Sequence, residues 1–418
     1  MKIKEVYEIY RSNPMICTDT RDIKKGSIFF GLRGENFNGN IFAEQAIDGG
    51  CICAIIDEEK FANNEKVFLV KNVLKTLQDL ARYHRKRLSI PIIGITGTNG
   101  KTTSKELIHS ILRSKLNCYA TKGNLNNHIG VPLSILEIND EHDMAIIEMG
   151  ANHKKEIEFL CEISKPTYGI ITNIGSAHLE GFKSIQGIID TKNELFNFIK
   201  AHNGSLFVNQ DDDLLIKLSK NIKRIAYGRN SKLGTSTISN TPFLNIKWNN
   251  MIIKSKLIGD FQFYNLSLAI SIGNHFNISK EKIQLAIESY IPQNNRSEIK
   301  KTKKNIVIMD AYNSNPSSMA AMLDSFSKQE YKNKLCILGD MLEMGKFSNQ
   351  EHTKIIKHCQ KLELEVLFVG KEFSKISNEA FKDLDSLKSF IKINPIKNKT
   401  ILLKGSRRIG LEKLVSYL

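Results

Sequence analysis

The segment Ile93-Gly-Ile-Thr-Gly-Thr-Asn-Gly-Lys-Thr-Thr103 contains the clearest structural signal in this chain. Residues 89–96 form a continuous apolar run that predicts a buried parallel strand, and residues 104–116 predict a helix. Glycines at such a turn let backbone N–H groups face phosphate oxygens, while the lysine neutralises phosphate charge and a hydroxyl can hold Mg²⁺. The general motif has glycine where this chain has Ile95, and we expect Gly97 to take that role. The segment therefore predicts a nucleotide site rather than an ordinary glycine-rich turn.

Apolar strand-like runs alternate with helical stretches after this loop, which is the pattern of a doubly wound parallel sheet. These runs lie at residues 144–149, 168–172, 205–208 and 222–227. Two further runs, 243–248 and 251–257, flank Asn249-Asn250, which is a hairpin signal. We therefore expect a central P-loop domain with a small β appendage.

Strand-like runs also occur on both sides of this central region. Those before it lie at residues 27–32, 51–56 and 66–70, and those after it at 305–309, 335–338, 365–369 and 400–403. The first set predicts a small α/β module, and the second predicts a Rossmann-like α/β domain that follows a polar linker near residues 291–298. The expected fold is α/β, with three domains at residues 1–84, 85–292 and 293–418.

Composition limits the class of protein. A chain of 418 residues with 41% hydrophobic and 25% charged residues can form two or three globular cores. No stretch approaches the roughly 18 apolar residues of a membrane helix, and the charged residues 1–10 do not resemble a secretory signal. The seven cysteines are scattered and lack zinc-site spacing, so we expect reduced core thiols. We expect a cytoplasmic protein without membrane insertion.

The net charge of +16 raises the question of nucleic-acid binding. The excess is mostly lysine spread along the whole chain, without a basic stripe interleaved with aromatic residues. We therefore expect no nucleic-acid partner. The charge instead favours polyanionic small molecules such as nucleotides.

Polar side chains follow two further strands of the predicted central sheet. Glu148 lies near the end of the run 144–149, and His178 follows the run 168–172. A helix that contains Lys192 is expected to open at residues 190–194. Ligands bind at the carboxyl ends of such strands, and a carboxylate there can coordinate Mg²⁺. Taken alone, Glu148 is equally compatible with a solvated strand end, a single histidine such as His178 is more often a capping or packing residue, and Lys192 is usually a surface charge on a helix. The functional interpretation therefore depends on the clustering of the strand ends.

Four segments together with the phosphate loop resemble the Mur ligases over essentially the whole chain. The segments are Asp19-Thr-Arg21 through Gly31-Leu-Arg-Gly-Glu-Asn-Phe-Asn-Gly39, Lys122-Gly-Asn-Leu-Asn-Asn-His-Ile-Gly-Val-Pro132, Asp310-Ala-Tyr-Asn-Ser-Asn-Pro316 and Leu338-Gly-Asp-Met-Leu-Glu-Met-Gly345. The resemblance implies an ATP-dependent amide ligase: ATP phosphorylates the terminal carboxylate of UDP-N-acetylmuramoyl-tripeptide, and the amine of D-alanyl-D-alanine attacks the acyl phosphate. It also implies a monomer.

The resemblance assigns the catalytic machinery to matching motifs. Lys101, His178 and Lys192 would be catalytic, and two Mg²⁺ ions would be held by Thr102, Glu148, His178 and a carbamylated Lys192. A carbamate turns a lysine into a carboxylate, which suits a hard cation. ATP would contact Gly97, Thr98, Asn99, Gly100, Lys101, Thr102, Thr103, Asn265, Arg296 and Asp310. Closure of the third domain about the linker would complete the site and exclude water.

Substrate-binding positions follow from the same resemblance. The first domain becomes a UDP-binding domain through Thr18, Asp19, Thr20, Arg21, Asn36 and Asn40. The acceptor and the dipeptide would contact Asn126, Asn127, Tyr312, Asn313, Asn315, Ser406 and Arg407. On sequence alone the first-domain segments would be interpreted as ordinary turns, and Lys404-Gly-Ser-Arg-Arg408 is equally compatible with a basic loop.

The sequence also departs from the pattern of the Mur ligases, and it is compatible with functions other than that of an amide ligase. Phe261-Gln262 replaces the His-Asn or Tyr-Asn pair usual before the helix that carries Asn265, which puts adenine contacts from that stretch in question. A folate polyglutamylating ligase or the third-residue Mur ligase typically has Ala-His where this chain has Tyr312-Asn313. A nucleic-acid-dependent P-loop ATPase and a catalytically inactive binding module are the competitors from other classes.

Overall fold

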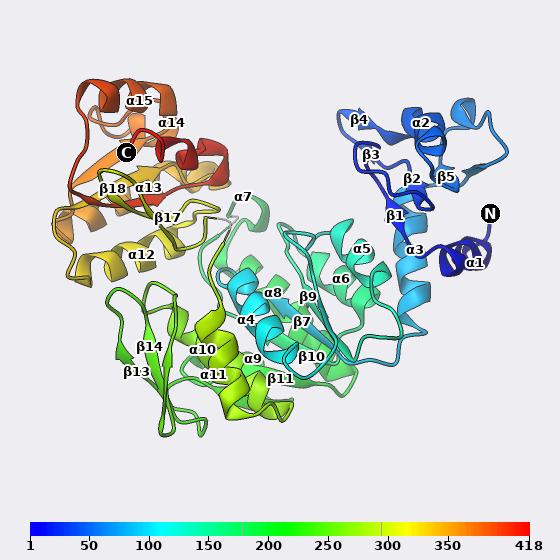
Figure 1. Ribbon diagram of the computed structural model, residues 1–418, viewed down its shortest axis with the longest axis horizontal. Coiled ribbons are helices and arrows are strands. Elements are labelled where there is room, and N and C mark those ends of the chain that lie inside the picture. Colours follow the sequence, from blue (N-terminus) through cyan, green and yellow to red (C-terminus); the bar gives the residue numbers. More distant parts are fainter. Residues whose placement is uncertain (178, 294) are drawn as a thin grey trace.

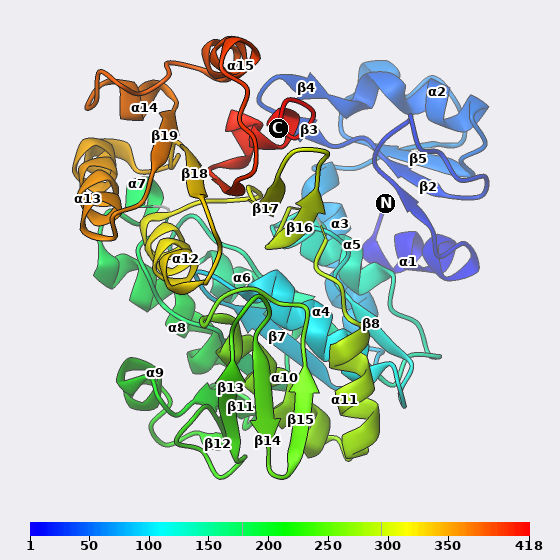
Figure 2. The same ribbon diagram turned by 60° about the vertical axis from the view of Figure 1, so that its left-hand side comes forward.

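The computed structural model describes residues 1–177, 179–293 and 295–418, and these build three α/β bodies (Figure 1). We call them the first, central and third domains, after the three largest sheets in chain order. In both views the first domain, in blue, and the third, in yellow to red, lie above the central domain (Figures 1 and 2). The α/β fold class predicted from the sequence is confirmed.

The first domain contains a parallel sheet in the order β1-β2-β5-β6. Its strands are β1 (Ile16–Cys17), β2 (Ile28–Phe30), β5 (Cys53–Ile56) and β6 (Val67–Leu69), and its helices are α1 (Ile3–Ser12), α2 (Ala43–Asp48) and α3 (Val73–Arg85). A short hairpin of β3 (Arg33–Gly34) and β4 (Phe37–Asn38) projects beside the sheet. Helix α3 connects this body to the central domain, where it packs on α5 and α6.

The central sheet is parallel throughout, in the order β12-β11-β10-β7-β9-β8. The strands are β7 (Ile92–Thr96), β8 (Cys118–Ala120), β9 (Met144–Glu148), β10 (Tyr168–Ile171), β11 (Ser205–Asn209) and β12 (Lys223–Tyr227). The helices are α4 (Lys101–Leu112), α5 (Gly130–Leu136), α6 (Glu156–Ser164), α7 (Leu179–Phe182), α8 (Ile185–Ala201), α9 (Asp213–Leu218), α10 (Gln262–His275) and α11 (Lys280–Ser289). This is the doubly wound arrangement that the sequence predicts.

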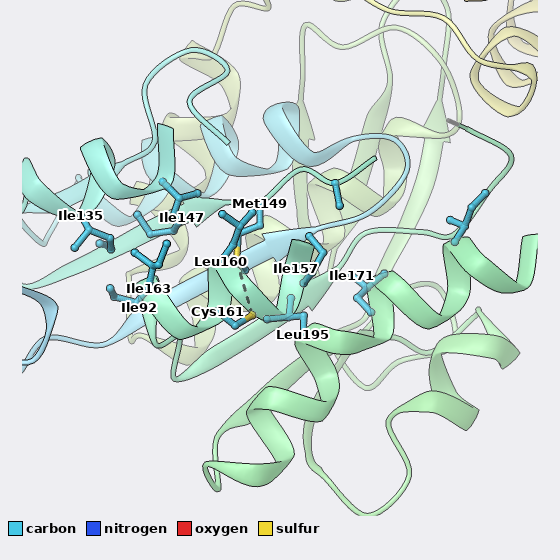
Figure 3. Packing of buried hydrophobic residues seen from close by; sticks show 14 of the residues in the cluster. Ile92, Ile135, Ile147, Met149, Ile157, Leu160, Cys161, Ile163, Ile171 and Leu195 are labelled. Atoms are coloured by element: carbon cyan, nitrogen blue, oxygen red, sulfur yellow. Dashed lines mark hydrogen bonds between the residues drawn. The ribbon is translucent and has the colours of Figure 1, made fainter. Parts of the chain in front are cut away.

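Helices cover both faces of the central sheet, so its middle strands are buried on both sides. Every residue of β7 and β9 is buried, which explains their continuous apolar sequences. Figure 3 shows Ile92, Ile147 and Met149 packed against Leu160 and Cys161 of α6, with Leu195 of α8 beside them. This packing fixes the carboxyl ends of the strands, where the polar residues lie.

The helix that carries Lys192 begins earlier than expected. The prediction that it opens at residues 190–194 is wrong, because the Ser184 hydroxyl accepts the backbone N–H of Gly187 and caps α8 at its start. Lys192 therefore lies in the middle of a long helix and not in its exposed first turn.

The third domain contains a sheet in the order β16-β17-β20-β18-β19, with β16 antiparallel at one edge. Its strands are β16 (Glu298–Lys301), β17 (Ile306–Asp310), β18 (Lys334–Gly339), β19 (Val366–Val369) and β20 (Thr400–Lys404), and its helices are α12 (Pro316–Lys328), α13 (Ser348–Lys361), α14 (Lys371–Ser374) and α15 (Leu384–Ile393). The expected β appendage of the central domain is an antiparallel sheet of β13 (Thr235–Ser239), β14 (Asn245–Trp248) and β15 (Met251–Lys254). Six strands were not predicted: β1, β3, β4, β8, β13 and β16.

All seven cysteines are buried and unbridged, as the sequence predicts. Among the described helices, none combines the length and the apolar character that crossing a membrane requires.

Candidate active site

The phosphate loop joins β7 to α4 in a conformation that needs its glycines. Gly97 has φ +143°, and a Cβ built on it would lie 2.0 Å from the Thr172 hydroxyl oxygen of the neighbouring strand end. Lys101 Nζ donates to the carbonyl oxygens of Gly97, at 2.7 Å, and Thr98, at 3.2 Å. Burial lowers the pKa of Lys101, an effect that the Glu148 carboxylate opposes. The Lys101 side chain therefore folds back onto the phosphate loop.

Glu148 ends β9 directly beside this loop. The Thr102 hydroxyl lies 3.3 Å from Glu148 Oε1, which also accepts from Asn126 Nδ2 at 2.9 Å. On the other side Lys105 Nζ lies 3.6 Å from Oε2, an oxygen that is buried and accepts no hydrogen bond from any described residue. A buried carboxylate oxygen of this kind, next to a hydroxyl at a helix N-terminus, is a hard oxygen-donor set that fits Mg²⁺.

Lys192 lies almost fully buried on α8, with 2% of its surface exposed. Burial is the main cause that lowers its pKa from 10.5 to about 7, and the charge of Lys101 lowers it further. Its Nζ lies 5.7 Å from the centre of the Phe182 ring. The surroundings of Lys192 therefore favour the uncharged amine over the ammonium form.

The predicted metal ligand His178 lies outside the described residues. Among the residues that are described, no group of three His, Cys, Asp or Glu side chains is assembled as a metal site. A site at Glu148 would therefore use the Thr102 hydroxyl and groups of the bound substrates, and one near Lys192 would need that amine converted to a carboxylate.

The third domain contributes residues from the ends of β17 and β20. Lys404 Nζ donates to Asp310 Oδ2 at 2.5 Å, although Lys404 is buried. The guanidinium groups of Arg296 and Arg407 lie 3.9 Å and 5.2 Å from the centre of the Tyr312 ring. Two guanidinium groups therefore lie within cation–π distance of the Tyr312 ring.

Direct hydrogen bonds join the third domain to the phosphate loop. Asn99 Nδ2 donates to the Ser317 hydroxyl at 3.0 Å, and Asn315 Nδ2 donates to Asn99 Oδ1 at 2.8 Å. Asn315 also caps α12, so this contact sets the helix against the loop.

A cavity of about 1430 Å³ lies between the central and third domains. Its walls contain most of the candidates from these two domains: Thr98, Asn99, Gly100, Lys101, Thr102, Thr103, Asn126, Asn127, Glu148, Lys192, Asn265, Arg296, Asp310, Tyr312, Asn313 and Asn315. Gly97, Ser406 and Arg407 do not line it; Ser406 is buried and accepts the N–H of Leu342. Such a volume suits a nucleotide together with part of a second substrate.

The first-domain candidates lie apart from this cavity, to which no described residue before Thr98 contributes. Asp19 and Arg21 form an exposed ion pair at 2.6 Å, which lowers the pKa of Asp19 to about 2. Asn40 is fully buried and holds the backbone and carboxylate of Asp57. Thr18 and Thr20 are half-buried, and Asn36 is exposed.

Two features of the site were not predicted from the sequence. Lys105 appears in the sequence as one more helix lysine, and nothing there indicates that it contacts Glu148. Gln262, noted only as a departure, accepts from Asn265 Nδ2 at 2.6 Å, while the Ser104 hydroxyl donates to Asn265 Oδ1 at 2.9 Å. Gln262 therefore orients Asn265 at the cavity wall, next to Phe261 and Tyr264.

Comparison with known proteins matches this architecture. Residues 95–273 match the Mur ligase middle domain, and residues 295–407 match the Mur ligase, glutamate ligase domain. The UDP-N-acetylmuramoyl-tripeptide–D-alanyl-D-alanine ligase of Bacillus subtilis is 31% identical over 423 residues, covering 96% of this chain and 92% of that protein. The chain belongs to the Mur ligase family.

Solved structures of Mur ligases agree with this assignment. MurF from Acinetobacter baumannii, at 29% identity, superposes with a TM-score of 0.86 over 96% of this chain and 92% of that one. The MurF ligase of Thermotoga maritima in complex with ADP, at 23% identity, shares the fold with a TM-score of 0.83 over 97% of both chains. The resemblance to Mur ligases that the sequence motifs indicate is confirmed.

Proposed function

We propose that this chain is an ATP-dependent ligase that joins D-alanyl-D-alanine to UDP-N-acetylmuramoyl-tripeptide in peptidoglycan precursor synthesis. The observation that carries the proposal is the cavity in which the phosphate loop of the central domain faces Arg296, Asp310 and Tyr312 of the third. A site divided between two domains suits a reaction in which one substrate is activated by ATP and another attacks it. The full-length match to ligases of this activity supports the choice of substrates.

The reaction has two steps. The terminal carboxylate of the tripeptide attacks the γ-phosphorus of ATP, which forms an acyl phosphate and releases ADP. The amine of the dipeptide then attacks the acyl carbon, loses a proton, and expels inorganic phosphate as the amide forms. The first step brings two anions together, so fixed positive charge is needed to offset their repulsion. Lys101 supplies that charge at the phosphate loop, and Arg296 and Asp310 would contact ATP from the third domain.

The remaining phosphate-loop residues hold the nucleotide. Gly97, Thr98 and Asn99 would shape the loop, because the N–H groups of Thr98 and Asn99 are bound to Asn173, and the backbone N–H groups of Gly100, Thr102 and Thr103 would donate to phosphate oxygens at the N-terminus of α4. Asn265, fixed by Gln262 and Ser104, would contact the nucleotide from α10. The substitution at Phe261-Gln262 therefore leaves Asn265 in place.

Magnesium fits the residues beside the loop. The Thr102 hydroxyl and the buried Glu148 carboxylate would hold one ion, and His178 with a carbamylated Lys192 would hold a second. When bound, the ions would neutralise the charge of the phosphates. The lowered pKa of Lys192, about 7, supplies the uncharged amine that must react with CO₂ to form a carbamate.

The first and third domains would determine which substrates the enzyme joins. The first domain, residues 1–84, would bind the uridine diphosphate end through Thr18, Asp19, Thr20, Arg21, Asn36 and Asn40. Asn126 and Asn127 of the central domain, residues 85–292, would bind the acceptor peptide. In the third domain, residues 293–418, Tyr312, Asn313, Asn315, Ser406 and Arg407 would bind the dipeptide, with the Arg407 fork on its carboxylate. The enzyme would act as a monomer in the cytoplasm.

Release of phosphate tests the proposal. The purified chain is incubated with UDP-N-acetylmuramoyl-tripeptide, ATP and Mg²⁺, with and without D-alanyl-D-alanine. We expect release only when the dipeptide is present, loss of release in Lys101→Met, and normal release in the exposed Lys86→Met. Release that ignores the dipeptide, depends on glutamate and folate, or responds to polynucleotide would assign the site to another reaction.

A further inference from the structure

The buried lysine of helix α4, Lys105, has no role in the reaction as described so far. It lies about one helical turn after Lys101, so both lysines belong to the same face of α4. Only 3% of Lys105 is exposed, and a lysine is rarely buried to this extent unless it is paired. We propose that Lys105 is a positioning residue that holds residues 121–128, here called the acceptor loop, beside the nucleotide site. This inference rests on the proposed ligase function.

The ammonium group of Lys105 binds the beginning of the acceptor loop. Its Nζ donates to the carbonyl oxygen of Thr121 at 2.7 Å and to that of Gly123 at 3.3 Å. The same Nζ forms an ion pair with Glu148 Oε2 at 3.6 Å. An ammonium group carries three donors and a full charge, so one side chain can serve two backbone carbonyls and a carboxylate together. Lys105 therefore joins α4 both to the loop and to the end of β9.

The acceptor loop is also bound directly to the end of β9. The Thr121 hydroxyl accepts the N–H of Glu148 at 3.0 Å, and the Asn126 side-chain amide donates to Glu148 Oε1 at 2.9 Å. The N–H of Gly150 donates to the carbonyl oxygen of Asn126 at 2.8 Å. The loop that would bind the acceptor and the carboxylate that would hold Mg²⁺ are therefore parts of one hydrogen-bonded unit, to which Lys105 contributes from α4.

The rest of the acceptor loop lines the cavity. Asn124, Asn126, Asn127 and His128 lie on the cavity wall, directly after the segment that the lysine holds. At the far end of the loop, Asn127 Oδ1 accepts the N–H of Gly130 at 2.9 Å, which binds the loop to the start of α5. Both ends of the loop are thus restrained, and this restraint lowers the entropic cost of ordering the loop when the acceptor peptide binds.

Binding of the acceptor tests the role of Lys105. Isothermal titration calorimetry measures the Kd values for UDP-N-acetylmuramoyl-tripeptide and for UDP, without ATP and in the presence of EDTA. Lys105→Met should raise the Kd for UDP-N-acetylmuramoyl-tripeptide about ten-fold, because the loop loses two hydrogen bonds. It should leave the Kd for UDP unchanged, because UDP would bind to the first domain.

Two further variants separate positioning from charge. Lys122→Met is the matched control, because Lys122 is an exposed lysine of the same loop, and it should bind both ligands like the wild type. Lys105→Met combined with Glu148→Gln removes one positive and one negative charge, so the net charge of the site is unchanged and neither charge of the pair is left buried alone. This double variant should bind UDP-N-acetylmuramoyl-tripeptide about ten-fold more weakly than Glu148→Gln alone.

Several outcomes would overturn the role of Lys105. They are an unchanged Kd for UDP-N-acetylmuramoyl-tripeptide in Lys105→Met, an equal loss of UDP binding in that variant, and a double variant that binds the acceptor as tightly as Glu148→Gln. Should Lys105→Met not fold, the comparison of the double variant with Glu148→Gln decides alone. Wild type that binds UDP-N-acetylmuramoyl-tripeptide no more tightly than UDP would instead reject the acceptor site of the proposed ligase.

Discussion

The side-chain amide of Asn99 donates to the hydroxyl of Ser317, 3.0 Å away, and this bond joins the phosphate loop directly to helix α12 of the third domain. The same Asn99 accepts from Asn315 at 2.8 Å. The loop and the third domain are therefore connected through a residue that also belongs to the proposed nucleotide site.

Replacing Asn99 by alanine should loosen the third domain. The variant removes the two hydrogen bonds that the Asn99 side chain makes with the third domain, each worth about 1 kcal/mol, while the backbone groups of residue 99 keep their bonds to Asn173. We expect a larger radius of gyration by small-angle X-ray scattering without ligands, and a smaller difference once ATP and UDP-N-acetylmuramoyl-tripeptide are bound. Identical scattering of both proteins without ligands would show that these bonds do not restrain the domain.

The buried pair of Lys105 and Glu148 should be energetically coupled. Removing one partner, in Lys105→Met or Glu148→Gln, leaves the other polar group buried without it and should cost about 3 kcal/mol. The double variant should therefore lower the thermal unfolding midpoint by less than the sum of the two single variants. The exposed pair Lys122 and Glu137 is the control and should show almost no coupling. Additive effects at positions 105 and 148 would contradict the pairing.

Most strands of the central sheet can be predicted from the sequence, because burial on both faces of the sheet requires continuous runs of apolar residues. Strands β7 and β9 are apolar at almost every position, since helices cover both faces of the sheet. Strand β16, with the sequence Glu298-Ile-Lys-Lys301, escapes prediction because an antiparallel edge strand with charged residues has neither an apolar run nor a clear alternation. This strand is defined by its hydrogen bonds to β17, and such pairing depends on the tertiary structure and not on the local sequence.

The site is only partly predictable for a similar reason. The phosphate loop and Glu148 are visible because a glycine-lysine motif and strand ends have fixed positions in such a fold. The burial of Lys105 depends on its bonds to the carbonyls of Thr121 and Gly123, from a loop that the helix pattern does not specify.

Lys192→Ala should abolish ligase activity. If a carbamate on Lys192 contributes a carboxylate to the site, added bicarbonate should not restore the variant, whereas a short carboxylic acid should restore part of its phosphate release. Lys200→Ala is the matched control, because Lys200 lies exposed near the end of the same helix. It should retain wild-type activity. Full activity in Lys192→Ala would remove this residue from the reaction.

The stability of the folded chain should fall in acid through His84, which lies buried between the first and central domains. Its Nε2 lies 2.7 Å from the carbonyl oxygen of Ile138, so Nε2 carries the hydrogen, and Nδ1 faces the Tyr7 hydroxyl at 3.4 Å. Burial is the main cause that lowers the pKa of His84, so the folded protein takes up the proton at a lower pH than the unfolded chain, whose pKa is about 6.5. Unfolding therefore binds a proton in this window, and stability falls as the pH drops below about 6.5.

Thermal unfolding of His84→Gln checks this sign. The variant lacks the titrating group, so its unfolding midpoint should fall less than that of the wild type when the pH is lowered from about 7.5 to about 5.5. His128→Gln, which removes an exposed histidine, should keep the wild-type dependence. The two variants lose the same number of titratable groups, so a difference between them isolates burial as the cause. A dependence in His84→Gln as steep as in the wild type would mean that other groups set the acid sensitivity of the protein.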